Sequence, residues 1–100
     1  MKKSRAEREL DELEEVFKAL AHNARRHILV VLQSRGGQMS AGEIAKRFSC
    51  SWPTTTRHLR QLENAGLVFV KKEGREQIYN VNVNKLNHVV GNWLGWFNEE

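Results

Sequence analysis

Apolar residues in the first third of the chain recur at three- and four-residue steps, the spacing of one face of an α-helix. A first stripe predicts a helix over about residues 5–21 and consists of Leu10, Leu13, Phe17 and Leu20. A second predicts a helix over about residues 24–33 and consists of Ile28, Leu29, Val31 and Leu32. The chain therefore opens with two amphipathic helices.

The middle of the chain carries the signals of two short helices separated by a polar turn. Ser40 and Glu43 have the S-x-x-E spacing of a capping box, in which each side chain accepts a hydrogen bond from the other residue's backbone N–H. Ser51 can cap the next helix, and Gly66 can end it, since glycine readily adopts the left-handed conformation of a helix terminus. The pattern predicts a helix-turn-helix over about residues 41–65.

The periodicity becomes strand-like after the helix-turn-helix. Two β-prone runs, residues 67–72 and 77–81, flank Glu73-Gly74-Arg75-Glu76, which is typical of a hairpin turn. This predicted wing spans about residues 67–81, and an apolar helix follows over about residues 84–97. The predicted fold class is mainly α with a two-stranded β-hairpin, a winged helix-turn-helix of order α-α-α-α-β-β-α.

Charge is distributed unevenly along the chain. Residues 1–15 carry four basic and six acidic side chains, a net charge of −2. Residues 22–60 carry seven basic side chains and one acidic side chain, a net charge of +6. A basic helix-turn-helix segment is typical of a protein that binds a polyanion such as DNA.

Length and composition limit the classes of protein to consider. One hundred residues predict a single domain, and no apolar run approaches the roughly 18–20 residues that cross a membrane. Charged residues follow the basic N-terminus, where a signal peptide has its apolar core. The single Cys50 excludes an internal disulfide and fits a reducing compartment. We therefore expect a cytoplasmic protein.

The second helix of the helix-turn-helix carries residue types that read DNA. An α-helix fits the major groove, where its first residues reach the base edges. Arg57 can pair with guanine or contact a phosphate, and Trp52 can stack on DNA or pack beneath the turn; both alternatives stay open. Lys46 and Arg47 are placed to hold the flanking strand. The candidate DNA-binding residues of this unit are Lys46, Arg47, Ser51, Trp52, Thr54, Thr56, Arg57 and Arg60.

These stretches resemble the ArsR type of winged-helix repressor. The resemblance lies in FKALAHNARRHIL (residues 17–29), Glu43-Ile44-Ala45, SWPTTTRHLRQLENAGLV (residues 51–68) and Gly74-Arg75 followed by Tyr79. It covers about residues 10–97, and the segment from the second helix of the helix-turn-helix to the wing is its most specific part.

The resemblance implies a homodimer, formed by the first and last helices, that binds partly palindromic operator DNA. It also implies that Arg75 in the hairpin reaches the minor groove, which makes it a candidate DNA-binding residue. Two departures matter. Asn23-Ala24 stands where the family often has Asp-Pro-Thr, and Trp52 stands where glutamine is common, so no base preference is transferred.

The last predicted helix has more apolar side chains than one helix face can bury. We expect the surplus to form a two-fold interface, because tryptophan is a favoured anchor in interfaces, and the resemblance implies that the first helix takes part in it. The predicted dimer-interface residues are Leu10, Leu13, Phe17, Val90, Trp93, Leu94, Trp96 and Phe97.

Other chemistry has weaker signals. No cysteine pair lies in residues 43–48, His22 and His27 are poorly spaced for joint ligation, and His58 fits a packing role, so we predict no metal site and no cofactor. No catalytic motif occurs, which predicts a protein that is not an enzyme. Cys50 near a helix start is a weak candidate for a thiol switch. The alternatives are a winged-helix protein-interaction module and a metal-responsive repressor with an unrecognised site.

Overall fold

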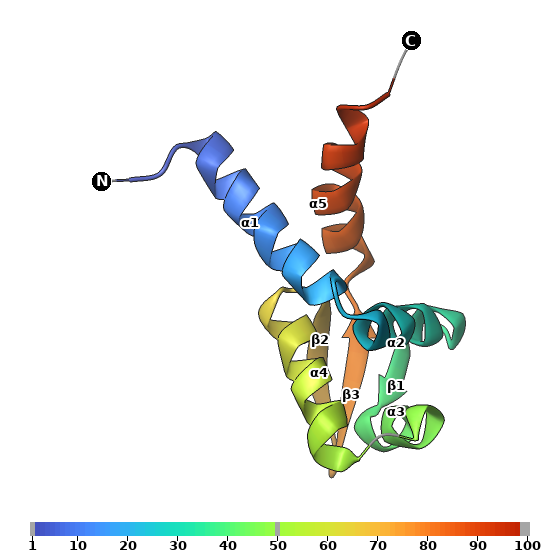
Figure 1. Cartoon of the computed structure of the whole chain (residues 1–100). Coiled ribbons are helices and arrows are strands. Elements are labelled where there is room, and N and C mark those ends of the chain that lie inside the picture. Colours follow the sequence, from blue (N-terminus) through green and yellow to red (C-terminus); the bar gives the residue numbers. More distant parts are fainter. Residues whose placement is uncertain (1, 50, 99–100) are drawn as a thin grey trace.

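The computed structural model describes residues 2–49 and 51–98, so the candidate thiol switch Cys50 lies outside the described residues. In chain order the elements are α1 (Arg5–Leu20), α2 (Asn23–Ser34), β1 (Gln38–Ser40), α3 (Ala41–Phe48), α4 (Trp52–Asn64), β2 (Val68–Glu73), β3 (Glu76–Val81) and α5 (Val83–Gly95). Figure 1 shows their arrangement. The predicted fold class, a mainly helical winged helix-turn-helix, is confirmed.

The sheet has one strand more than the sequence predicted. β2 and β3 form the predicted antiparallel hairpin, which pairs Val68 with Val81. Gly74, with a φ of +61°, supplies the left-handed backbone of its two-residue turn. β1 pairs with the other edge of β3 and places Met39 opposite Tyr79. A strand of three residues is too short to show the alternation of apolar and polar positions that reveals longer strands.

The C-terminal end of α4 is a Schellman motif centred on Gly66. The Leu67 N–H donates to the Leu62 carbonyl and the Gly66 N–H donates to the Glu63 carbonyl, both at 2.9 Å. Gly66 has a φ of +76°, the left-handed conformation that this motif needs. Leu62 and Leu67 are fully buried and supply the apolar contact that accompanies it. These contacts hold the end of α4 in place.

The core lies where α2, α3 and α4 meet the sheet, and Val16 and Ala19 of α1 and Val89 of α5 join it. Its fully buried side chains include Leu32, Ile44, Leu59 and Leu62, all of which the helical spacing predicts to face inward. Burial of one such side chain contributes about 1.5–3 kcal/mol. In contrast, Val89 is the one buried residue of α5 within the described part of the chain.

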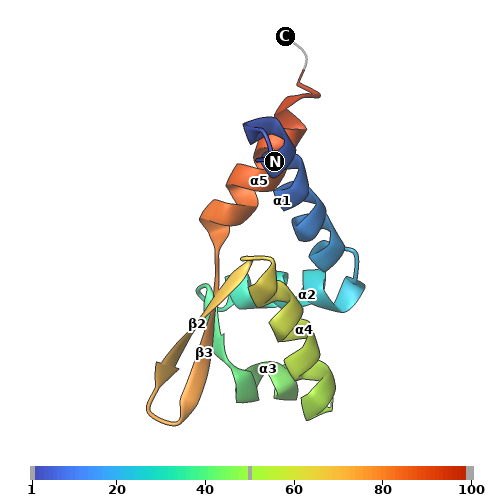
Figure 2. The same cartoon turned by 90° about the vertical axis from the view of Figure 1, so that its left-hand side faces the viewer.

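α1 and α5 project together from the rest of the molecule (Figures 1 and 2). We call these two helices the arm, and we call α2, α3, α4 and the sheet the body. α5 ends at Gly95, so Trp96 and Phe97 lie in the turn beyond the helix in which they were predicted. The Phe97 N–H donates to the Leu94 carbonyl at 3.0 Å in that turn.

Candidate nucleic-acid interface

Hydrogen bonds around Ser51 fix the first turn of α4. The Ser51 hydroxyl accepts a hydrogen bond from the Thr54 backbone N–H at 3.3 Å and donates to Thr54 Oγ1 at 2.9 Å. The hydroxyl of the buried Thr55 donates to the Ser51 carbonyl at 3.1 Å. The side chain of Ser51, a predicted DNA-binding residue, is therefore engaged in the helix cap, and it contributes to the site by fixing the geometry of this turn.

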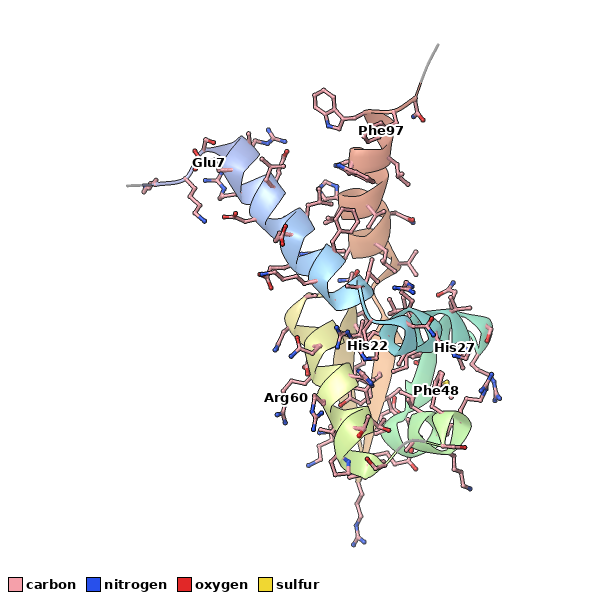
Figure 3. The ribbon with its side chains drawn as sticks, in the orientation of Figure 1. Glu7, His22, His27, Phe48, Arg60 and Phe97 are labelled. Carbon is pink, nitrogen blue, oxygen red and sulfur yellow. The ribbon has the colours of Figure 1, made fainter. Side chains whose placement is uncertain are left out.

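The other predicted residues of α4 stand on its outer face. Trp52, Arg57 and Arg60 are exposed, and Thr54 and Thr56 are partly buried. Figure 3 shows Arg60 pointing away from the body. Trp52 is 56% exposed, so its indole is not packed into the core. The first two turns of α4 thus present an indole, two hydroxyls and the Arg57 guanidinium to the surroundings, and Arg60 adds a second guanidinium one turn later.

A hollow of about 420 Å³ lies between the starts of α3 and α4 and the wing. Trp52 lines it from the helix, and Lys72, Arg75 and Glu76 line it from the wing. Two cations beside an exposed indole suit the backbone of a nucleic acid, since phosphates attract cations and sugars pack on aromatic faces. Lys72 is missing from the predicted residues, although the pair Lys71-Lys72 next to the hairpin turn was a signal that could have indicated it.

The capping box predicted at the start of α3 is confirmed. The Glu43 N–H donates to Ser40 Oγ at 3.1 Å, and the Ser40 N–H donates to the Glu43 carboxylate at 3.0 Å. Hydrogen bonds that the Glu43 carboxylate accepts from the backbone N–H and from the side chain of Ser40 lower the pKa of this carboxyl group. At the other end of α3, Lys46 and Arg47 are exposed, and the Arg47 guanidinium lies 5.4 Å from the centre of the Phe48 ring. The cap fixes the helix that presents both cations.

Two arginines of the basic segment are engaged in the fold. Arg25 Nε donates to the Ala19 carbonyl at 2.7 Å, and an Arg26 guanidinium nitrogen donates to the Leu20 carbonyl at 2.6 Å. Both carbonyls belong to the last turn of α1, where the helix itself provides no partner. The basic footprint of residues 22–60 is therefore only partly available to DNA, because these two side chains join α2 to α1.

Two histidines connect the turn between α1 and α2 to α4. The rings of His22 and His58 meet edge-to-face with their centroids 4.5 Å apart (His22 is labelled in Figure 3). His22 Nδ1 accepts the Ala24 N–H at 3.2 Å and so caps α2. His58 is buried, as its predicted packing role requires, and its Nδ1 has no hydrogen-bond partner among the described residues. Burial lowers the pKa of His58, and the positive charges nearby lower it further by a smaller amount.

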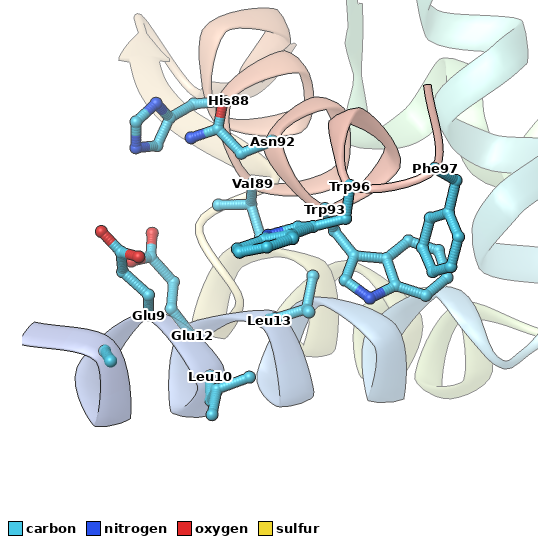
Figure 4. A pocket seen from close by; sticks show the side chains of 11 residues that line it. Glu9, Leu10, Glu12, Leu13, His88, Val89, Asn92, Trp93, Trp96 and Phe97 are labelled. Carbon is cyan, nitrogen blue, oxygen red and sulfur yellow. The ribbon is translucent and has the colours of Figure 1, made fainter. Parts of the chain in front are cut away.

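The arm has a groove of about 410 Å³ between its two helices (Figure 4). Phe17 of α1 and Trp93 of α5 meet edge-to-face with ring centroids 5.2 Å apart, and Phe97 lies 5.1 Å from Trp93. Trp96 is 85% exposed. Of the predicted dimer-interface residues, Leu13 and Val90 are partly buried, and the exposed ones are Leu10, Phe17, Trp93, Leu94, Trp96 and Phe97. The arm therefore carries much apolar surface that one chain does not cover.

Across residues 2–49 and 51–98, no three His, Cys, Asp or Glu side chains are grouped as metal ligands would be. Within the same residues, every helix is too short or too polar to span a membrane.

Known proteins share this arrangement. A family model described as a helix-turn-helix domain matches residues 20–70. The chain is 37% identical to the transcriptional repressor SdpR of Bacillus subtilis over 79 residues, which are 79% of this chain and 84% of that protein. The structure of this chain is similar to that of an ArsR-like transcriptional regulator from Rhodococcus, with a TM-score of 0.73 and 34% identity. The similarity covers 83% of this chain and 76% of the regulator.

A second solved structure adds an observation on assembly. The chain is similar to a homodimeric winged helix-turn-helix DNA-binding domain from Mycobacterium bovis, described as a possible ArsR-family transcriptional regulator. The TM-score is 0.74 at 28% identity, and the similarity covers 99% of this chain and 93% of that domain.

Proposed function

The chain belongs to the ArsR family of winged helix-turn-helix transcriptional repressors, and from this premise we propose that it binds a partly palindromic operator as a homodimer. Two copies of α4, related by a two-fold axis, would enter successive major grooves about 34–36 Å apart. Repression then needs no chemistry, because a protein bound at a promoter blocks the polymerase. The proposed place of action is the cytoplasm.

The observation that carries the proposal is the outer face of α4 beside the wing. We assign Trp52, Thr54, Thr56 and Arg57 to base edges in the major groove, because they stand on the first two turns of the helix. The cations farther from the first turn are assigned to phosphates, and these are Lys46, Arg47, Arg60 and Lys72. Arg75 at the tip of the wing is assigned to the minor groove, as the family resemblance implies.

The proposed dimer rests on the arm. Seven large apolar side chains are exposed on α1, α5 and the turn after α5, although water contact with each is unfavourable. Pairing with the arm of a second copy would cover them and place the two bodies on either side of a two-fold axis. The homodimeric relative from Mycobacterium bovis supports this assembly.

A mobility-shift assay on the DNA upstream of the protein's own gene, repeated across a range of salt concentrations, tests the proposal. We expect tighter binding to this DNA than to random DNA, with an affinity that falls steeply as salt rises, because bound phosphates release counterions. Arg57→Ala should reduce discrimination between the two DNAs, whereas Arg75→Ala should weaken binding to both. Equally weak, salt-insensitive binding to both DNAs would instead support a protein-interaction module.

A further inference from the structure

Asn82 stands at the corner where the wing meets the arm, and it holds three different partners. Its Nδ2 donates to the Gly66 carbonyl at 3.0 Å, and its backbone N–H donates to the Leu67 carbonyl at 2.9 Å. Its Oδ1 accepts the Lys85 N–H at 3.2 Å and thereby caps α5. One side chain therefore joins the start of α5 to the segment that ends α4.

Lys85 extends this junction to the other helix of the arm. Its ammonium group lies 2.6 Å from the Glu12 carboxylate on α1, and both side chains are partly shielded from solvent. The stem of Lys85 passes over Gly66, where an added Cβ would lie 3.4–3.5 Å from Nζ and Cε. We call Glu12, Gly66, Asn82 and Lys85 the junction. Asn82 bonds α5 to the segment that ends α4, and Glu12 of α1 holds the Lys85 side chain against Gly66 in the same segment.

The junction lies where the arm meets the body, so a small change of angle there moves the far end of α4 by a larger distance. α5 leaves the body there and projects away from it (Figures 1 and 2). α4 has 13 residues and is therefore about 20 Å long at 1.5 Å per residue, so the start of its first turn lies about 20 Å from the junction at its other end. A tilt of about 10° at the junction end would move that first turn by about 3.4 Å, the rise of one base pair.

We infer that Asn82 and Lys85 are positioning residues that fix the angle between arm and body, and thereby select the spacing of operator half-sites. The inference rests on the proposed function, because spacing has meaning only for a dimer on a two-part operator. If two arms pair rigidly, the separation of the two copies of α4 depends on the angle at each junction. Weakening the junction should therefore leave recognition of one half-site intact and relax the spacing requirement.

Asn82→Asp tests the side-chain hydrogen bond to Gly66. Aspartate retains the oxygen that caps α5, but it lacks the N–H that Gly66 accepts and places a carboxylate against that carbonyl. Asn82→Ser retains a cap without the added charge. The matched control is Asn80→Asp, because Asn80 Nδ2 donates within its own strand, to the Ile78 carbonyl at 3.3 Å.

The readout is binding to a set of duplexes derived from an operator selected out of random DNA. The set keeps both half-sites and changes their spacing by one base pair in each direction, and one further duplex carries a single half-site. We expect the wild-type protein to prefer the selected spacing by at least about tenfold, and the Asn82 variants by less than about threefold. Affinity for the single half-site should change by less than about twofold, and sedimentation should still show dimers.

The ion pair gives an independent second test. Lys85→Gln and Glu12→Gln should each relax the spacing preference, and the charge-exchanged double variant, Glu12→Lys with Lys85→Glu, should restore it. Lys18→Gln is the matched control, because the exposed Lys18 pairs with Glu15 inside α1 at 4.0 Å. This test remains decisive if the Asn82 variants fail to fold.

Two results would overturn the inference. In one, the folded Asn82 and Lys85 variants keep the wild-type spacing preference. In the other, single half-site and full-operator affinities fall by the same factor, which indicates damage to the recognition surface itself. A wild-type protein that binds neither the operator nor the half-site would refute the proposed function and, with it, this inference.

Discussion

The body and the arm are built from the same apolar residue types but dispose of them differently. Leu62 in the body is fully buried between α4 and its neighbours, whereas Leu94 in the arm leaves 52% of its surface exposed. The apolar side chains of the body are largely buried within one chain. Those of the arm are largely exposed, and they have the composition of an interface core, rich in tryptophan and phenylalanine. Exposure thus separates a part that folds for itself from a part suited to bind a second copy.

The largest expected effect comes from comparing one leucine in each region. Leu62→Ala should lower the free energy of unfolding by about 2–5 kcal/mol, because it leaves a cavity in the core. Leu94→Ala, measured at a concentration where the protein is monomeric, should change it by less than about 0.5 kcal/mol. Urea titration followed by circular dichroism measures both. Equal losses would show that Leu94 stabilises the monomer as much as Leu62 does and would contradict the comparison.

Two exposed tryptophans allow the same comparison at the level of function. Trp96→Ala should weaken dimerisation by about 2 kcal/mol or more, because central interface tryptophans carry much of the binding energy. Trp52→Ala should leave dimerisation unchanged and weaken DNA binding. Sedimentation velocity and fluorescence anisotropy with labelled operator separate the two effects. A loss of dimerisation on changing Trp52 would place the interface elsewhere.

Two arginines of the basic segment sharpen the boundary between the site and the fold. Arg57→Ala should cost about 1–3 kcal/mol of discrimination between operator and random DNA, with little change in stability. Arg25→Ala should lower stability by about 1–3 kcal/mol, because the Ala19 carbonyl loses a charged donor. Thermal melts and competition binding on both variants check this. If Arg25→Ala impairs only DNA binding and leaves stability unchanged, Arg25 belongs to the DNA-binding site and not to the fold.

The smallest expected effect is a dependence of stability on pH. The pKa of His58 lies below the ordinary 6.5, mainly because burial disfavours the charged ring and also because His22, Arg25 and Arg57 are near. The unfolded chain therefore binds the proton more readily, so stability is complete above about pH 6.5 and falls as the pH drops toward the folded-state pKa. Chemical denaturation across this range should show the decline, and His58→Gln should reduce its slope. An unchanged slope would remove His58 as the cause.

Local patterns made much of the body predictable from the sequence. The capping box at Ser40 and Glu43 uses residues three apart, and the buried face of α4 follows from helical spacing, so no knowledge of distant contacts was needed. The hairpin turn at Gly74 likewise follows from one short segment. The resemblance to a known family rests on these same stretches.

Contacts between distant segments account for what the sequence could not supply. β1 exists because Met39 and its neighbours meet β3 some forty residues later. Arg25 counts toward the basic charge of residues 22–60, but its guanidinium is engaged by the end of α1, which only the fold brings beside it. Lys72 and Trp52 line the same hollow, although they are 20 residues apart in the sequence, because the fold places the wing beside the start of α4. The bond between Asn82 and Gly66 spans 16 residues and has no local signature.

Selection of bound sequences from a random DNA library tests the central claim most directly, because it requires both the reading face of the body and the pairing of two arms. The account predicts enrichment of two inverted half-sites whose centres lie about one helical turn, about 10 base pairs, apart. Enrichment of a single isolated half-site would contradict the dimer, and the absence of any enriched sequence would contradict specific DNA recognition.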